Sequence, residues 1–385
     1  MVIETVIASR NLQTEVVPLG AASGRVLARA VTADRDYPPA ARSIRDGFAV
    51  RAADLPGTLE IAGEVRAGRV YGGEVAAGQC VEIMTGAPVP RGADAIVMVE
   101  HTTRNGSRMT TARVPKPGEF IVPAGAEARH GAVVLPEGVR IGFPQVALLA
   151  TVGLTNVPVF RKPRVAIVST GDEVIGVDQT PGPAQVRNAN AWALAVQVTE
   201  AGGEPEILPV APDDLDRTRQ LVAQGLERDI LLLSGGVSAG KYDFVEPALA
   251  SLGADFLFDR VLIQPGQPLV FGRARGKCFF GLPGNPASSM VTFKTIAAAA
   301  VELSAGLRAS ELRIPRLRLT TDFHHKSGLT RFLPALVSGD GTLVTPLPWQ
   351  GSGDVAALAR ANAFLVAEAD RESWKKGDEM GVIFS

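Results

Sequence analysis

The sequence predicts an α/β multidomain protein with a central doubly wound α/β domain. Between residues 162 and 308, short apolar segments alternate with helical ones, an order typical of a mostly parallel sheet covered by helices. The segment "ILLL" at residues 230–233 is apolar without a period of two, as in a strand buried on both faces. On either side of this domain, short β-like segments alternate with Gly- and Pro-rich turns, which predicts further β-rich domains.

Shifts in composition predict the order of the domains along the 385 residues. Residues 1–35 are expected to be mostly helical, because apolar residues recur at helical spacing around Val6 and through "AASGRVLARAV". The segment "GFPQVALLATVGLTNV" from Gly142 is expected to be one further helix. The predicted domains are a helical N-terminal and linker domain (1–45 and 141–161), an inserted β-rich domain (46–140), the α/β domain (162–308) and a C-terminal β-barrel-like domain (309–385).

The α/β domain is expected to contain six strands and four helices. The strands are "RVAIVST", "EPEILPV", "DILLLSG", "FDRVLI", "PLVFGR" and "KCFFGLPG". The helices are "NANAWALAVQVTEAG", "DDLDRTRQLVAQGLER", "DFVEPALASLG" and "NPASSMVTFKTIAAAAVELSA".

Charge and composition argue against several classes of partner and site. The net charge is -1, from 39 basic and 40 acidic residues, so no field that attracts nucleic acid is expected. The first 20 residues lack the pattern of a signal peptide, and no apolar run is long enough to span a membrane, so a cytoplasmic location is expected. Cys80 and Cys278 are expected to be buried thiols, and a His/Cys metal cage is not expected.

Three predicted strands end in unusual loops. These loops are Gly171-Asp172-Glu173, the segment "SGGVSAGKYD" from Ser234, and "LPGNP" from Leu282 to Pro286. If the strands are parallel, all three loops open at one sheet edge, where α/β proteins bind their ligands. Glycines let the backbone turn N–H groups toward an anion, and helix N-termini favour negative charge. The sequence therefore predicts a site for a phosphate-bearing ligand, although each loop alone is also an ordinary strand-to-helix turn.

The second loop resembles a P-loop but departs from it in two ways. Gly235, Gly240 and Lys241 fit the pattern G-x-x-x-x-G-K, but Tyr242 stands where a P-loop has the hydroxyl that holds Mg²⁺. A helix that begins at Lys241 would carry Pro247 in its second turn, where proline removes a hydrogen bond. A later start, with Asp243 as the cap, places Pro247 in the first turn. A longer, more open anion-binding loop is the preferred interpretation, and a P-loop NTPase stays as an alternative.

Several carboxylates accompany these loops and suit a hard cation such as Mg²⁺. Asp46 precedes a glycine, which is a turn signal and also presents a carboxylate at a tight turn. Asp213 is either a helix cap or a metal ligand, and Asp243 is a helix cap on the Gly-rich loop. Thr85 with Gly86 offers a hydroxyl and a backbone donor, or forms an ordinary turn. Arg331 and Ser352 are candidates for contact with an anion.

Six segments, read in order, resemble one family. These are "RSIRDGFAV", "IMTGAPVPRGADAIVMVE", "VAIVSTGDEV", "LLLSGGVSAGKYDFV", "QPGQPLVFG" and "FFGLPGNPASSMVTF". They are similar to segments of bacterial molybdopterin molybdenumtransferases, a family that includes the E domain of gephyrin. The resemblance covers nearly the whole chain and is weaker after residue 309, where it depends on "TRFLPA" and "QGSG".

The resemblance implies a transferase in the last step of molybdenum cofactor biosynthesis. Such an enzyme binds adenylylated molybdopterin, inserts molybdate at the dithiolene and releases AMP in a step that depends on Mg²⁺. The resemblance also implies an elongated homodimer of four-domain subunits, with the active site in a cleft between the α/β molybdopterin-binding domain of one subunit and parts of the other. Molybdopterin adenylyltransferase and apo-molybdoenzymes are the further partners implied, and neither nucleic acid nor a membrane is expected.

The resemblance also implies the site residues. The catalytic set is Asp46, Thr85, Glu173, Asp213 and Asp243, with Asp243 and Glu173 as contacts of Mg²⁺. The set that binds the cofactor is Ser234, Gly235, Gly236, Ser238, Arg260, Gln264, Pro283, Gly284, Asn285, Pro286, Arg331 and Ser352.

The chain departs from the family at Gln264 and Gln267, where many members have lysines. Glutamine keeps hydrogen-bond donors but loses the charge, so more of the anion binding would fall to Arg260, Lys241 or Arg331. This departure supports an alternative, a non-catalytic molybdopterin-binding or scaffold protein with the same fold. The choice between molybdate and tungstate is open at this point.

Overall fold

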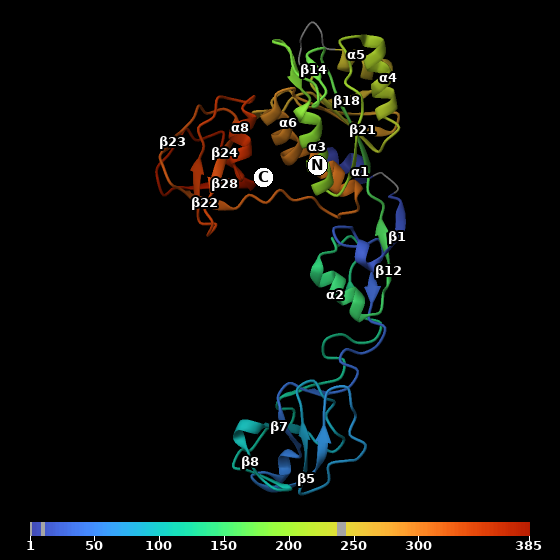
Figure 1. The fold of residues 1–385 in the computed structure, drawn as a ribbon, viewed down its shortest axis with the longest axis vertical. Helices are drawn as coiled ribbons and strands as arrows, with labels where there is room; N and C mark the ends of the chain where they lie inside the picture. Colours follow the sequence, from blue (N-terminus) through green and yellow to red (C-terminus); the bar gives the residue numbers. More distant parts are fainter. Residues whose placement is uncertain (1, 9–11, 237–243) are drawn as a thin grey trace.

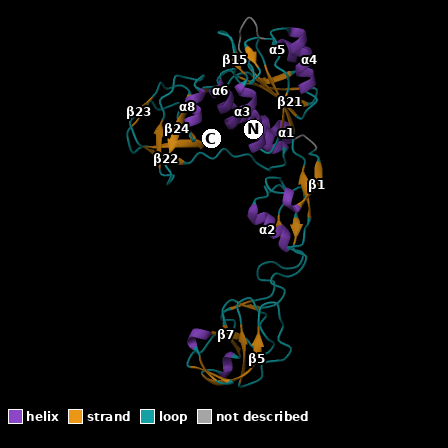
Figure 2. Ribbon diagram, viewed as in Figure 1, coloured by secondary structure: helices purple, strands orange, loops and turns teal. Residues whose placement is uncertain are grey.

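The fold is that of a computed structural model, which describes residues 2–8, 12–236 and 244–385. Its parts follow one another along an elongated molecule (Figure 1). The α/β part and the C-terminal barrel lie at one end, and the sheet that contains β4, β5 and β7 lies at the other. A small part with β1, β12 and α2 connects the two ends (Figures 1 and 2).

The α/β part has a six-stranded sheet at its centre, with the order β16-β13-β17-β21-β20-β18. The first four strands are parallel to one another, and β20 and β18 are antiparallel to their neighbours. All five residues of β17 are buried, as the uninterrupted apolar run predicts. The strands are β13 (Arg164–Ser169), β16 (Glu204–Ile207), β17 (Ile230–Ser234), β18 (Asp255–Phe258), β20 (Val270–Ala274) and β21 (Lys277–Leu282).

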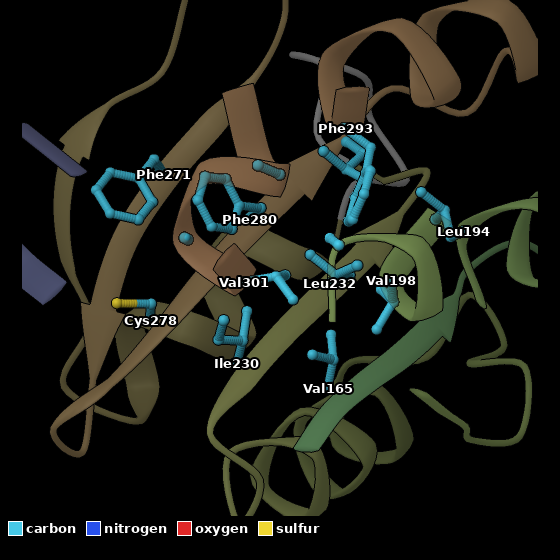
Figure 3. Close-up of a cluster of buried hydrophobic side chains, with 14 of the residues drawn as sticks. Val165, Leu194, Val198, Ile230, Leu232, Phe271, Cys278, Phe280, Phe293 and Val301 are labelled. Carbon is cyan, nitrogen blue, oxygen red and sulfur yellow. The ribbon is translucent and has the colours of Figure 1, made fainter. Parts of the chain in front are cut away.

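Helices cover both faces of this sheet, so the predicted doubly wound α/β class is confirmed. On one face, side chains of the sheet such as Leu232 and Phe280 pack against Val198 and Phe293 from the helices (Figure 3). On the other face, Leu231 and its neighbours pack against α4 and α5. The helices are α1 (Val2–Ala8), α3 (Ala189–Glu200), α4 (Leu215–Gly225), α5 (Val245–Ser251), α6 (Pro286–Thr292) and α7 (Ala298–Ser304), with a π-helical turn at Phe293–Ala297.

Two details of the α/β part differ from the sequence prediction. The predicted strand at residues 258–263 is wrong, because β18 ends at Phe258 and the short β19 is Ile263–Gln264. Between them, the Val261 amide donates to the carbonyl of Gln267, so this backbone bonds to a loop instead of the sheet. Helix α5 begins at Val245 with Phe244 at its N-cap, which places Pro247 in the first turn as predicted. The predicted cap, Asp243, lies outside the described residues.

The inserted part is rich in β-structure, as predicted, and contains a six-stranded sheet with the order β7-β4-β6-β5-β9-β8. Its apolar cores include the buried Cys80, and Cys278 is buried in the α/β part, so both cysteines are buried, as predicted. Burial raises the pKa of the Cys80 thiol to about 12, which keeps it protonated. The strands are β4 (Gly47–Val50), β5 (Gly57–Val65), β6 (Gln79–Ile83), β7 (Ala95–Met98), β8 (Thr103–Asn105) and β9 (Arg108–Thr111), with 3-10 turns at Ala52–Asp54 and Val99–His101.

The prediction that residues 1–35 are mostly helical is wrong. Only α1 is an α-helix in the described part of this segment, and it packs against α7 of the α/β part. The backbone at Leu27 instead forms an antiparallel bridge with Val159, and Gly24 has a left-handed φ of 77° that ends any helix. Residues 1–35 contain β1 (Thr14–Pro18), β2 (Val31–Thr32) and a 3-10 turn at Leu19–Ala21. Short strands outside this segment pair with one another or with β2: β3 (Arg42–Ser43), β10 (Ile121–Val122) and β11 (Val133–Leu135).

The predicted helix at residues 142–157 is only partly present. Helix α2 is Phe143–Thr151, and Gly153, with a φ of 75°, follows it. Strand β12 (Asn156–Phe160) then pairs antiparallel with β1. The segment therefore returns to the N-terminal residues as a strand and not as a helix.

The C-terminal part contains a closed five-stranded barrel, which confirms the predicted barrel-like domain. The sheet order is β24-β25-β22-β28-β26, and pairing of β24 with β26 closes it, while β19 adds to the edge of β24. No helix in the described ranges is long and apolar enough to cross a membrane. The elements are β22 (Arg316–Leu319), β23 (Phe323–His324), β24 (Thr330–Val337), β25 (Leu343–Pro346), α8 (Val355–Arg360), β26 (Ala363–Ala367), β27 (Ser373–Trp374) and β28 (Glu379–Phe384).

Candidate functional site

A cavity of about 840 Å³ lies at the carboxyl ends of β13, β17 and β21. Because these strands are parallel, their three following loops open at one edge, as the sequence predicts. A small two-stranded ribbon, β14 (Val174–Ile175) and β15 (Val186–Arg187), contributes to the wall. The predicted site residues that line the cavity are Glu173, Asp213, Ser234, Gly235, Gly236, Pro283, Gly284, Asn285 and Pro286.

Backbone hydrogen bonds hold the three strand ends together below this cavity. The Thr170 amide donates to the carbonyl of Ser234 over 3.1 Å. The Gly235 amide donates in turn to the carbonyl of Leu282 over 3.0 Å. The sheet pairing therefore continues to the point where each loop begins, so the loops start from fixed positions.

Glycine is required where the loops meet. Gly235 and Gly236 have left-handed φ values of 93° and 64°, which other residues rarely adopt. A Cβ at Gly235 would lie 3.0 Å from the hydroxyl oxygen of Thr170. A Cβ at Gly284 would lie 3.5 Å from the Cα of Gly235, an ordinary van der Waals contact, so the second and third loops lie close together at this point. Three glycines, Gly235, Gly236 and Gly284, therefore line the cavity where the loops meet.

The third loop leads into α6 with the predicted residues at the predicted positions. Asn285 is the N-cap and Pro286 is the first helical residue. Within the described residues, however, the Asn285 side chain makes no capping hydrogen bond. Because Asn285 lines the cavity, its side-chain amide is available to a ligand.

Carboxylates gather at the first loop. Burial and the neighbouring charges of Asp172 and Glu173 raise the pKa of Asp213. The Glu173 carboxylate packs over Gly171, where an added Cβ would lie 2.4 Å from a carboxylate oxygen. The expectation that Asp213 caps the next helix is wrong, because the Asp214 side chain accepts from the Arg217 amide at that end of α4. Asp213 is therefore left facing the cavity.

Four predicted residues lie near the barrel, outside the cavity lining. Gln264 and Arg331 are partners in the parallel pairing of β19 with β24. The Nε atom of Arg331 is buried without a hydrogen-bond partner in the described part of the chain. The carbonyl of Ser352 accepts from the Ala287 amide of α6 over 2.9 Å, next to Gly353, which does line the cavity. Arg260 is exposed between β18 and β19.

Asp46 and Thr85 are brought together, but at the other end of the molecule. The Thr85 amide donates to Oδ1 of Asp46 over 2.6 Å. This bond, together with the Thr85 hydroxyl, lowers the pKa of Asp46. Both residues are exposed and belong to the part that contains β4 and β6, far from the α/β part in Figure 1. Ser238 and Asp243, the remaining predicted residues, lie outside the described residues.

Two asparagines in the cavity wall are absent from the sequence prediction. Asn188 caps α3, and its Oδ1 accepts from the Ser169 hydroxyl over 2.8 Å and from the Ala191 amide. The side chain of Asn190 donates to the Ser234 hydroxyl and to the carbonyl of Gly284. The only sequence signal is "NAN" at the start of a predicted helix, which indicates a cap but not which loops the side chains reach.

Three family models match the chain in succession. Residues 2–153 match the MoeA N-terminal region (domain I and II), and residues 166–302 match a probable molybdopterin binding domain. Residues 316–384 match the MoeA C-terminal region (domain IV). The cavity described above is formed mainly within the second matched region.

Whole-chain comparisons agree with these matches. The chain is 37% identical to a molybdopterin molybdenumtransferase from Bacillus subtilis (strain 168), over 96% of this chain and 90% of the relative. It is 33% identical to one from Staphylococcus epidermidis, over 94% of this chain and 89% of the relative. A solved structure, the molybdopterin biosynthesis moeA protein from Pyrococcus horikoshii OT3, has a TM-score of 0.81 at 29% identity and covers 100% of this chain and 98% of that chain. The chain therefore belongs to the molybdopterin molybdenumtransferase family of enzymes.

Proposed function

We propose that this protein inserts molybdate into adenylylated molybdopterin and releases AMP in a Mg²⁺-dependent step. The observation that carries the proposal is the meeting of two Gly-rich loops and two carboxylates in one cavity at the carboxyl edge of the sheet. Such an edge suits a phosphate-bearing ligand, and the size of the cavity suits a cofactor. Cytoplasmic location, and docking of molybdopterin adenylyltransferase or of apo-molybdoenzymes, belong to the same proposal.

The donor set of the cavity fits Mg²⁺. Glu173 and Asp213 supply carboxylate oxygens. Burial first, and then the charges of Asp172 and Glu173, raise the pKa of Asp213, and a bound cation would offset both effects. In the described ranges, no three Asp, Glu, His or Cys side chains are placed to hold a metal together. Mg²⁺ is commonly bound by one or two carboxylates with phosphate and water oxygens, which matches this arrangement. When bound, Mg²⁺ would neutralise charge that develops on the phosphoanhydride.

The polypeptide contributes binding and orientation. Backbone N–H groups of the loops that contain Gly236 and Gly284 would bind phosphate oxygens, and the Asn285 amide is free to add a further contact. The molybdate substrate is a dianion and needs cationic or N–H donors. Arg331, whose Nε has no partner among the described residues, and Ser352 are the groups assigned to it. Gln264, next to Arg331 in the strand pairing, would contribute an uncharged donor.

We further propose that the enzyme works as a homodimer. Asp46 and Thr85 belong to the catalytic set implied by the family. They adjoin β4 and β6, in the sheet that lies at the opposite end of the molecule from the α/β part with its cavity (Figure 1). A second copy of the chain would bring its own Asp46 and Thr85 to this cavity. The exposure of both residues is compatible with contact across a subunit interface.

The direct test is AMP release from adenylylated molybdopterin in the presence of molybdate and Mg²⁺. The proposal predicts release that requires both ions and that is lost on chelation of Mg²⁺. Binding of the substrate without AMP release, by protein that is fully folded, would instead support a non-catalytic molybdopterin-binding or scaffold protein. Steady ATP hydrolysis that Lys241→Ala abolishes would support the P-loop alternative.

A further inference from the structure

The Asn190 side chain joins the second and third loops of the cavity. Its Nδ2 donates to the Ser234 hydroxyl over 3.0 Å and to the carbonyl of Gly284 over 2.8 Å. Ser234 is the last residue of β17, and Gly284 lies between β21 and α6. One amide group therefore uses both of its N–H donors to connect two segments that are 50 residues apart in the sequence.

Hydrogen bonds at the start of α3 fix the position from which the Asn190 side chain extends. Asn190 lies in the first turn of α3, two residues after the cap residue Asn188. The buried Asn188 accepts from the Ser169 hydroxyl at the end of β13, which ties the start of α3 to the sheet. Asn190 is half-buried and lines the cavity, so it acts at the boundary between the core and the ligand space.

The two segments that Asn190 connects are also joined by the backbone bond from the Gly235 amide to the carbonyl of Leu282, two residues before Gly284. Gly235 and Gly236 have left-handed backbones, and glycine restricts the unbound chain less than any other residue. A Cβ at Gly284 would come within 3.5 Å of the Cα of Gly235, so the two segments lie close together. A small change in the separation of the two segments would therefore move the backbone N–H groups of both loops relative to one phosphate. Binding depends on the position of these donors relative to the phosphate.

We propose that Asn190 is a positioning residue, which sets the spacing of the two Gly-rich loops so that both bind the same phosphate-bearing ligand. The inference rests on the proposed function for the identity of that ligand. It assigns no bond-making step to Asn190. Its loss is expected to weaken ligand binding and to leave the rate of the bound complex nearly unchanged.

Gln197 offers a matched control on the same helix. Its Nε2 donates to the carbonyl of Met290 in α6 over 3.1 Å, so it also connects α3 to a backbone carbonyl of the α6 region. Gln197 lines a different cavity, between α3, α7 and the C-terminal strand. Asn190→Ala and Gln197→Ala are both expected to lower the melting temperature. Only Asn190→Ala is expected to raise KM for adenylylated molybdopterin, by about tenfold, with kcat changed by less than about twofold.

Two further variants distinguish the effect of losing the Asn190 hydrogen bonds from the effect of losing its side-chain volume. Asn190→Asp keeps the shape but loses both N–H donors and places a carboxylate against the Gly284 carbonyl, so it is expected to raise KM at least as much as alanine does. Ser234→Ala removes one of the two acceptors and is expected to raise KM by a smaller factor. Normal binding by Asn190→Asp would overturn the inference, and this variant also serves if Asn190→Ala does not fold.

Equilibrium binding of molybdopterin keeps the inference testable without turnover. If the wild-type protein binds molybdopterin but releases no AMP, the proposed function fails while the role of Asn190 is still measured through Kd. A Kd for Asn190→Ala that rises by about tenfold relative to Gln197→Ala supports the inference. Equal Kd values for the two variants, with both proteins folded, would refute it.

Discussion

Asp213 is the residue in the cavity wall whose ionisation the structure perturbs most directly. Its folded-state pKa is raised by burial first, and then by the charges of Asp172 and Glu173. Folding therefore disfavours the ionised carboxylate. The free-energy cost of this ionisation is absent at a pH below the ordinary pKa of about 3.9. It grows between the ordinary pKa and the raised folded-state pKa, and it is constant above the folded-state pKa.

We accordingly predict that Asp213→Asn raises the melting temperature at pH 7 while it lowers the activity. The amide cannot ionise, so the variant avoids the cost of charge repulsion but loses a carboxylate assigned to Mg²⁺. Thermal unfolding at pH 7 and at about pH 3.5 provides the measurement, and the advantage of the variant should vanish at the lower pH. A lower melting temperature at pH 7 would contradict this interpretation.

Gly47 shows how closely the backbone is packed beside Asp46. A Cβ at Gly47 would lie 2.0 Å from the carbonyl oxygen of Val97, a backbone atom in the neighbouring strand β7. The β-rich sheet would have to open to accept any side chain at this position. The Asp-Gly pair is therefore needed for strand packing as well as for the turn that presents Asp46.

We predict that Gly47→Ala lowers the free energy of unfolding by about 2 kcal/mol or more, because overpacking against backbone cannot relax easily. Gly72→Ala in the same part of the chain is the control, since a Cβ there meets no heavy atom of the described residues within 4 Å. Chemical denaturation of both variants gives the comparison. Equal losses of stability would mean that the close contact of Gly47 with Val97 is not the cause.

At the scale of elements, the helix starts differ in what their cap residues do. Asp214 at the start of α4 accepts from the Arg217 amide over 2.8 Å, and Asp354 caps α8 in the same way. Asn285 occupies the N-cap of α6 without such a bond in the described residues. Helix α6, whose start lines the cavity, thus begins with a polar side chain that does not cap its own helix.

We therefore predict that Asp214→Ala and Asn285→Ala have opposite profiles. Loss of the bonded cap at Asp214 should cost about 1 kcal/mol of stability with little effect on ligand affinity. Asn285→Ala should cost only a few tenths of a kcal/mol and should weaken the binding of molybdopterin. Denaturation and equilibrium binding measure the two quantities, and a destabilised Asn285→Ala with normal affinity would make Asn285 a structural cap only.

The elements that sequence patterns predicted correctly are those with a local signature. The run "ILLL" predicted a strand buried on both faces, and β17 is one. "AASGRVLARAV" has helical spacing but is not helical, because Leu27 pairs with Val159, a partner more than 100 residues away. Similarly, no local pattern shows that Asn190 reaches Gly284. Errors in the prediction therefore occur where backbone or side-chain partners are distant in the sequence.

At the scale of the whole molecule, the sequence predicted the class of the α/β, inserted and C-terminal parts. It predicted neither the class of the N-terminal part nor the distances between the parts. The shared sheet edge followed from parallel strands, and Glu173, Gly236 and Asn285 do line one cavity. The pairing of Asp46 with Thr85 and their separation from that cavity depend on how the parts are arranged along the elongated molecule (Figure 1). Composition and spacing contain no information on that arrangement.

The separation between the two groups of residues gives a test of the proposed homodimer. Asp46→Ala and Glu173→Ala are each expected to be inactive as purified proteins. If a site combines the cavity of one chain with Asp46 of another, a mixed dimer of the two variants contains one intact site. The intact site has Glu173 from the Asp46→Ala chain and Asp46 from the Glu173→Ala chain.

Co-folding the two variants in equal amounts should therefore restore about a quarter of the wild-type AMP release, because about half of the dimers are mixed and each has one working site of two. Asp46→Ala mixed with Asp46→Ala,Glu173→Ala is the control, since none of its dimers contains an intact site. A site built within one chain predicts no recovery in either mixture. Recovery only in the first mixture would show that Asp46 of one subunit acts at the cavity of the other. The elongated shape of the subunit would then bring Asp46 to the partner's cavity.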